Sequence, residues 1–138
     1  MQINKVENIL MRRPFWMNVV FLFCVYMTFV YLPWDVFIKP IAEDEEVWFG
    51  FIFYGWMAKL GGIVHWIVYG SLTYGLCYMR PWARPCVGLY LLQVAWSMFV
   101  WAFLTDDLSA MWASLAVALI FVFLSILFYR TKSFSDSD

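Results

Sequence analysis

The sequence predicts an all-α integral membrane protein with four transmembrane helices in an up-down antiparallel bundle. Hydrophobic residues make up 64% of the 138 residues and charged residues only 14%, with a mean hydropathy of +0.74. A soluble globule of this length would need more polar surface. Long apolar runs and the alternation of basic and acidic connections lead to the same fold class.

Four apolar runs are long enough to cross a bilayer, because a helix needs about 20 residues to span about 30 Å of hydrocarbon. Pro33 is expected to close the first run, and Arg80 and Pro81 follow the second. Residues 15–130 are therefore predicted to form a single transmembrane domain. Its spans are expected at residues 15–32, 57–79, 86–104 and 110–129.

The connection after the first span, residues 34–56, is predicted to lie along the outer membrane interface, where Pro40 prevents a continuous helix. Residues 47–79 would measure about 50 Å as one helix, which exceeds the bilayer. We expect either one extended helix or two segments, with the bend at Gly61 and Gly62. The stretch EVWFGFIFYGWMA would then be a helix extension or an outer-leaflet helix.

Charge alternates between the connections and predicts the orientation, because cationic connections remain in the cytoplasm. Both termini are therefore expected inside, as in a bacterial inner membrane. Residues 1–14 have the composition of a short interfacial helix, and residues 131–138 that of a disordered tail. The basic connections hold Lys5, Arg12, Arg13, Arg80, Arg84, Arg130 and Lys132. The outer charged rim is predicted to hold Asp35, Glu43, Asp44, Glu45, Glu46, Lys59, Asp106 and Asp107, with Lys39 as the other outer cation.

Six polar residues at helical spacing form the candidate binding site within the membrane. Counting back from the inner end of the second span places Lys59 at the outer boundary and His65 about 10 Å below it. The two stripes are expected to face each other. They form either interhelical hydrogen bonds, worth about 0.6 to 2 kcal/mol each, or a functional pocket around an ionisable group. The stripes are His65, Tyr69 and Thr73 on the second span, and Tyr90, Gln93 and Ser97 on the third.

Several chemical functions are disfavoured by the residues present. The net charge of -1 argues against a nucleic-acid partner. Cys24, Cys77 and Cys86 lack the spacing of a disulfide or zinc site, so neither a metal nor another cofactor is expected. No catalytic motif occurs, and we assign no catalytic residues and expect no enzyme. Every acidic residue is predicted to lie outside the apolar core of its span, which argues against a proton-coupled exporter.

Two functions remain. The first is a non-catalytic accessory, assembly or scaffold subunit that acts by helix–helix contacts, with the lipid bilayer and a membrane-protein partner or a second copy around it. The alternative is a homo-oligomeric transporter or channel for a small solute or ion, with a polar midplane site around His65 and Gln93. A water-filled cavity at that depth would favour the alternative, and a sealed bundle the first function.

Overall fold

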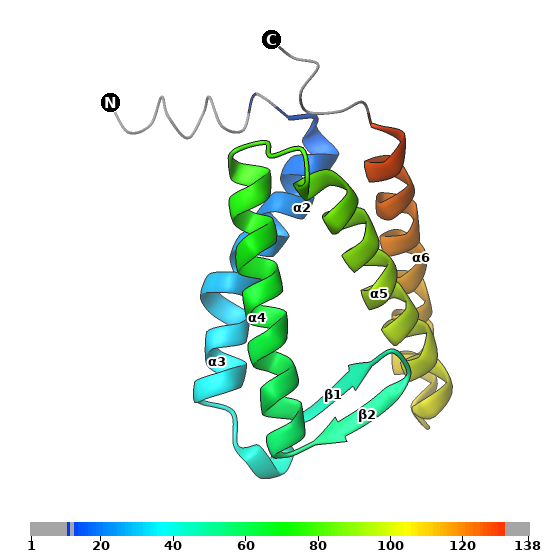
Figure 1. The fold of residues 1–138 in the computed structure, drawn as a ribbon. Coiled ribbons are helices and arrows are strands. Elements are labelled where there is room, and N and C mark those ends of the chain that lie inside the picture. Colours follow the sequence, from blue (N-terminus) through cyan, green and yellow to red (C-terminus); the bar gives the residue numbers. More distant parts are fainter. Residues whose placement is uncertain (1–10, 12, 132–138) are drawn as a thin grey trace.

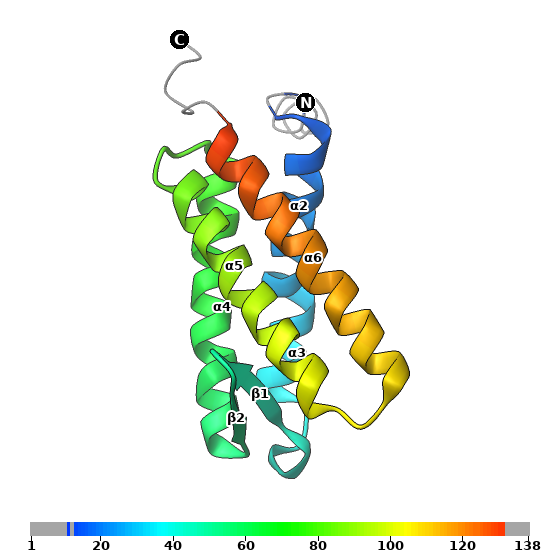
Figure 2. The same ribbon diagram turned by 90° about the vertical axis from the view of Figure 1, so that its right-hand side faces the viewer.

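The computed structural model describes residue 11 and residues 13–131, and most of this chain is helical. The predicted N-terminal segment and C-terminal tail lie almost wholly outside the described residues. Successive long helices run side by side in opposite directions (Figure 1, Figure 2). The helices are α2 (Phe15–Tyr26), α3 (Leu32–Phe37), α4 (Trp56–Cys77), α5 (Ala83–Leu104) and α6 (Leu108–Arg130).

Three helices are long and apolar enough to cross a membrane: Phe15–Phe37, Ala83–Leu104 and Leu108–Arg130. They contain the predicted spans 15–32, 86–104 and 110–129. The predicted span 57–79 corresponds to α4, which has 22 residues but a less apolar composition. The described chain therefore has three candidate membrane-spanning helices and one more helix beside them.

Pro33 does not close the first helix, so that prediction is wrong. A π-helical turn over Met27–Tyr31 joins α2 to α3, and the Leu32 N–H bonds to the Met27 carbonyl. A wider turn accommodates a proline, which has no N–H to donate and whose ring crowds the preceding turn. The carbonyl of Thr28 receives no hydrogen from Pro33 and instead accepts from the Trp66 indole at 2.7 Å. The widened turn thus also ties this helix to α4.

A β-hairpin stands between α3 and α4, where the sequence analysis expected helix. After a short 3-10 helix at Ile41–Glu43, strand β1 (Glu45–Trp48) pairs antiparallel with β2 (Phe51–Tyr54). Phe49 and Gly50 both have positive φ angles, 49° and 93°, as a tight two-residue hairpin turn requires. Aromatic and β-branched residues on both sides of this turn favour strands over helix. The predicted helical extension is therefore wrong for these strands.

Gly61 and Gly62 do not bend α4, which runs without interruption from Trp56 to Cys77. The stretch 47–79 does not exceed the bilayer as one helix, because α4 begins only at Trp56 and the residues before it form the hairpin. The two glycines instead permit close packing. A Cβ at position 61 would lie 2.7 Å from Trp48 Nε1, and one at position 62 would lie 3.3 Å from Asp35 Oδ2.

The hairpin lies between the diverging ends of α4 and α5. These helices approach each other near their shared turn and separate toward the other end, where the hairpin sits (Figure 1). Its tip reaches α5, since a Cβ on Gly50 would be 3.4 Å from Val100. Near the shared turn an apolar core fills the space between helices, made of Met17, Val20, Leu72, Leu76, Val87, Leu91 and Phe128.

We predict that Gly75→Ala destabilises the turn between α4 and α5 by about 1 to 3 kcal/mol. The added methyl would lie 2.7 Å from Ala83 Cβ and from the Trp82 ring, and one of the two backbones would have to move. Gly70→Ala is the matched control on the same helix, since its methyl would meet only Thr28 Cγ2 at 3.7 Å. Equilibrium unfolding in detergent measures both variants. Equal stability of the two would contradict the close packing at Gly75.

Candidate functional site

Four charged residues lie together where α3, α4 and the base of the hairpin meet, and we call them the acid–lysine cluster: Asp35, Lys39, Asp44 and Lys59. Lys39 Nζ lies 2.7 Å from Asp44 Oδ1 and 3.3 Å from Asp35 Oδ1. Lys59 Nζ lies 3.1 Å from Asp44 Oδ2 and donates to the Asp35 carbonyl. Asp44 is 1% exposed, Asp35 2% and Lys59 5%. The cluster is thus a buried ion-pair network.

The local sequence explains why these groups converge. Asp35 and Lys39 are four residues apart and share one face at the end of α3. Pro40 then ends the helix, and the short 3-10 turn brings Asp44 back toward Lys39. The Gly55 N–H bonds to the Asp44 carbonyl at 3.0 Å and closes the base of the hairpin. Lys59 follows in the first turn of α4, directly over the cluster.

The cluster sets the charge state of its members outside the spanning helices. Burial by itself would raise the pKa of the Asp44 carboxyl, but hydrogen bonds and charges from Lys39 and Lys59 outweigh burial and lower that pKa. Burial by itself would lower the pKa of Lys39, but its hydrogen bond to Asp44 and the charge of Asp35 raise it. Each partner therefore keeps the other ionised.

A second group, the hairpin latch of Glu46, Trp48 and His65, lies beside the cluster. His65 Nδ1 is 3.3 Å from Glu46 Oε2, with both side chains largely buried. The Trp48 ring stacks on the imidazole, with centroids 4.1 Å apart and an interplanar angle of 28°. A carboxylate can only accept, so Nδ1 carries the hydrogen of this contact. The latch attaches β1 to α4.

The structure brings together part of the polar set predicted within the membrane. The Tyr90 ring on α5 lies 5.9 Å from the His65 ring and 5.1 Å from the Tyr69 ring on α4. Gln93 donates to Ser97 on its own helix at 3.1 Å. Thr73 turns toward the first helix, where its hydroxyl lies 3.2 Å from that of Thr28.

The predicted outer rim divides into a buried and an exposed part. Asp35, Asp44 and Lys59 are buried, and Glu46 is half-buried beside His65. Asp107 instead caps α6 by accepting from the Ser109 N–H at 2.9 Å. The exposed members are Glu43, Glu45, Asp106 and Asp107.

Two members of this site were missing from the predicted set. Lys39 was noted only as a cation of the outer connection, although its spacing from Asp35 signals a shared helix face. Trp48 was noted only as part of the stretch EVWFGFIFYGWMA, which was expected to be helical. The signal for strands here is the aromatic and β-branched residues on both sides of Phe49 and Gly50, and a strand directs alternate side chains to opposite faces.

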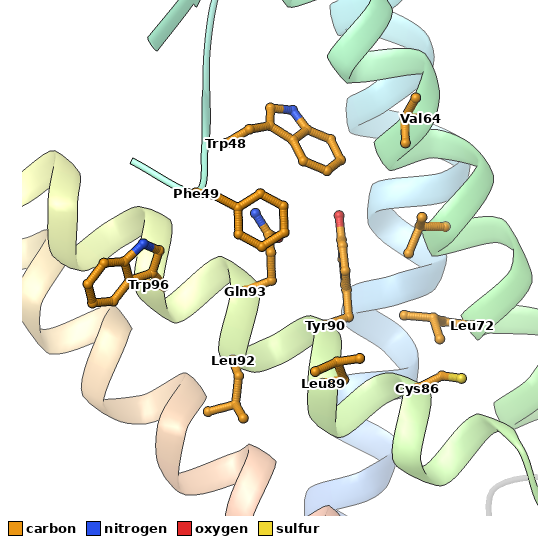
Figure 3. Close-up of a pocket in the computed structure, with 11 residues that line it drawn as sticks. Trp48, Phe49, Val64, Leu72, Cys86, Leu89, Tyr90, Leu92, Gln93 and Trp96 are labelled. Atoms are coloured by element: carbon orange, nitrogen blue, oxygen red, sulfur yellow. The ribbon is translucent and has the colours of Figure 1, made fainter. Parts of the chain in front are cut away.

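An apolar groove of about 670 Å³ lies between α4 and α5, next to the hairpin tip (Figure 3). Of the predicted polar set, Tyr90 and Gln93 line it, and the Tyr90 hydroxyl points toward Trp48 (Figure 3). His65 and Ser97 are not among its lining residues. Within the described part of the chain, no group of three or more His, Cys, Asp or Glu side chains is placed to hold a metal ion.

Comparison of the chain with protein-family models, with curated proteins and with solved structures finds no match. The functional argument therefore depends on the geometry described above.

We predict that Lys59→Met destabilises the fold by about 3 kcal/mol or more, because it leaves buried carboxylate charge with one lysine fewer. The double variant Lys59→Met/Asp44→Asn removes a buried acid as well and should recover part of this loss. Equilibrium unfolding of the wild type, both single variants and the double variant measures the coupling. Strictly additive effects would show that Lys59 and Asp44 do not interact.

We predict that the contribution of Asp44 to the free energy of unfolding decreases as the pH falls. The pKa of Asp44 is lowered from its ordinary value of 3.8, so its stabilisation is fully present above that pH and is lost as pH falls through the lowered pKa. Asp44→Asn lacks this component, so its stability deficit relative to the wild type should shrink below about pH 4. Thermal unfolding between pH 6 and pH 2.5, with exposed Asp106→Asn as control, measures the deficit. A constant deficit over that range would refute the assignment.

Proposed function

We propose that this protein acts by contact within the membrane, as an accessory, assembly or scaffold subunit of a larger membrane complex. The observation that supports this role best is the distribution of polar groups along the helices. The acid–lysine cluster and hairpin latch lie at one end, and the Tyr69 and Tyr90 rings lie on their inner side. Beyond them the described core is filled by apolar side chains, including Leu76, Val87 and Phe128. Such a core offers no polar path for a solute.

The surface of α6 supplies the contact area for this role. Only 17% of its most apolar window is buried within the chain, and that window has a mean hydropathy of 2.5. Small residues let α6 approach α5 closely: Ser125 Oγ donates to the Gly88 carbonyl at 2.7 Å. Its other side presents large apolar residues, including Leu119, Ile120 and Phe123, to lipid or to a partner helix.

We further propose that α4 also crosses the membrane, giving four spans with both termini in the cytoplasm of a bacterial cell. α4 has the same length as α5, 22 residues each, and runs alongside it (Figure 1). The start of α2, the α4–α5 turn and the end of α6 lie at one end, and the short 3-10 helix and the α5–α6 turn lie at the other (Figure 1). Arg13, Arg80 and Arg130 belong by sequence to the first set of segments, and Glu43 and Asp106 to the second. This separation of charge is what the positive-inside rule requires of such a topology.

The alternative function, a homo-oligomeric transporter or channel, has one observation in its favour. Buried His65 Nε2 and Gln93 Oε1 have no hydrogen-bond partner within the described chain. Polar atoms of this kind gain partners when water or a solute enters. Because the core beyond them is apolar, a path would have to form between copies of the chain.

A photoreactive amino acid at Phe123 tests the contact role in native membranes. We expect a discrete adduct with one other membrane protein, identified by mass spectrometry. Phe51 on the hairpin is the matched control, because it is 70% exposed against 60% for Phe123 but lies outside the helices. It should not form the same adduct. An adduct with the mass of two copies would identify a second copy of the chain as the partner, and adducts with lipid alone would contradict a contact role for this face.

A further inference from the structure

The apolar groove between α4 and α5 extends from near the turn that joins these helices to the hairpin tip. On α5, its lining begins at Cys86 and ends at Trp96. Cys86 and Leu89 lie at one end of the groove and Trp48 at the other (Figure 3). Cys86 and Leu89 are both exposed, so this end of the groove is open to the medium around the helices.

The length of the groove matches one leaflet of a bilayer. Cys86 and Trp96 are ten residues apart, which corresponds to about 15 Å along a helix. The hydrocarbon of a bilayer is about 30 Å thick, so one leaflet accounts for about 15 Å. The groove begins about one helical turn after Ala83, the first residue of α5. Its dimensions therefore suit one acyl chain of a lipid in the leaflet that contains the α4–α5 turn.

Apolar contact alone does not select a lipid for this groove. A lipid chain is surrounded by equally apolar neighbours in the bilayer, so the hydrophobic effect gives it no reason to move between helices. A lipid that binds here must therefore be selected by the contacts of its headgroup. The polar groups nearest the open end of the groove belong to the α4–α5 turn.

The two ends of the molecule carry opposite charge. Every Asp and Glu among the described residues belongs to α3, to the segment from the 3-10 helix to β1, or to the α5–α6 turn. These segments lie at the end opposite the α4–α5 turn (Figure 1). The segments at the end of the α4–α5 turn carry Arg13, Arg80, Arg84 and Arg130 instead. An anionic headgroup is therefore attracted to this end and repelled from the other.

Two of these four arginines are engaged with backbone carbonyls. Arg13 donates to a carbonyl near the end of α4 at 2.9 Å, and Arg84 donates to the carbonyl of the residue after α6. Arg80 and Arg130 are exposed, and no ion pair joins either of them to another residue in the described part of the chain. Arg80 lies in the turn that connects the two walls of the groove, whereas Arg130 ends α6. Arg80 is thus the arginine placed to meet a headgroup at the open end.

We propose that the groove binds an anionic phospholipid of the cytoplasmic leaflet, with one acyl chain lying along α5 from Cys86 to Trp96 and the phosphate at Arg80. A guanidinium binds phosphate through charge-assisted hydrogen bonds. Trp82, two residues after Arg80, is exposed at the same level, where indole rings commonly meet headgroups. The site rests on the proposal that α4 crosses the membrane beside α5, and it adds a lipid to the contact role.

Native mass spectrometry of the delipidated protein in detergent tests this site. Phosphatidylglycerol is the anionic probe, and phosphatidylcholine with the same acyl chains is the zwitterionic control. We expect one bound phosphatidylglycerol, favoured over phosphatidylcholine by about fivefold or more, which is the effect of one basic residue next to an anionic headgroup. Equal binding of the two lipids would overturn the proposal.

Two pairs of variants locate the bound lipid. Arg80→Gln should lower the affinity for phosphatidylglycerol about fivefold, whereas Arg130→Gln at the same end should retain it. Leu89→Trp fills the open end of the groove and should abolish the bound lipid. Leu119→Trp on α6, at a position 72% exposed against 65% for Leu89, should leave it in place. Unchanged binding in Arg80→Gln or Leu89→Trp would overturn the site, as would equal losses in the two arginine variants.

Modification of the native cysteines by N-ethylmaleimide tests where the acyl chain lies. Phosphatidylglycerol should slow the modification of Cys86, which lines the groove, and leave that of half-buried Cys77 on α4 unchanged. Peptide mass spectrometry measures each cysteine separately. If Cys86 is protected in native membranes but phosphatidylglycerol does not restore this protection after delipidation, the occupant is a polypeptide and the proposal is wrong. The contact role of α6 would still stand, because the adduct at Phe123 forms on another helix.

Discussion

A buried ammonium group needs a carboxylate in contact with it, and Lys59 is such a group, only 5% exposed. Asp44 supplies this carboxylate, and its contact with Lys59 holds the segment before β1 against α4. Since β1 begins at the residue after Asp44, fixing this carboxylate also fixes where the strand starts. Glu46 and Trp48 then reach His65, and the hairpin enters the space between α4 and α5. A partnered charge of this kind adds little net stability, yet it specifies one arrangement.

The helices were predictable because hydropathy is averaged over many residues and single exceptions do not change the result. The wrong predictions came from local rules for proline and glycine, at positions where contacts between elements decide the structure. Pro33 signals a helix end, but a π-helical turn absorbs it. Gly61 and Gly62 signal a bend, but their lack of a side chain serves the approach of Trp48 and α3. The strands are short and embedded in a continuous apolar run, where period-2 alternation is weak.

At the candidate site, the depth of a residue could be predicted from the sequence, but its contact partners could not. Depth along the membrane normal can be counted from residue numbers, and it identified His65 as an unusual group. The direction of a side chain around its helix axis cannot be counted in that way. The Gln93 amide N–H donates to Ser97 on its own helix, and the Thr73 hydroxyl meets that of Thr28 on the first helix. His65 meets Glu46, which a depth count assigns to the outer rim, because the hairpin carries that residue inward.

Because α4 and α5 separate toward one end, the hairpin that lies between them there acts as a spacer. The two helices converge at the turn that contains Met79, a non-glycine residue with a φ of 51°, and they open toward the hairpin (Figure 1). An insert at the wide end of a V determines its angle. α6 is packed along α5, so the pair would tilt together about the narrow end. A short hairpin at the wide end would thereby set the slope of both helices relative to α4.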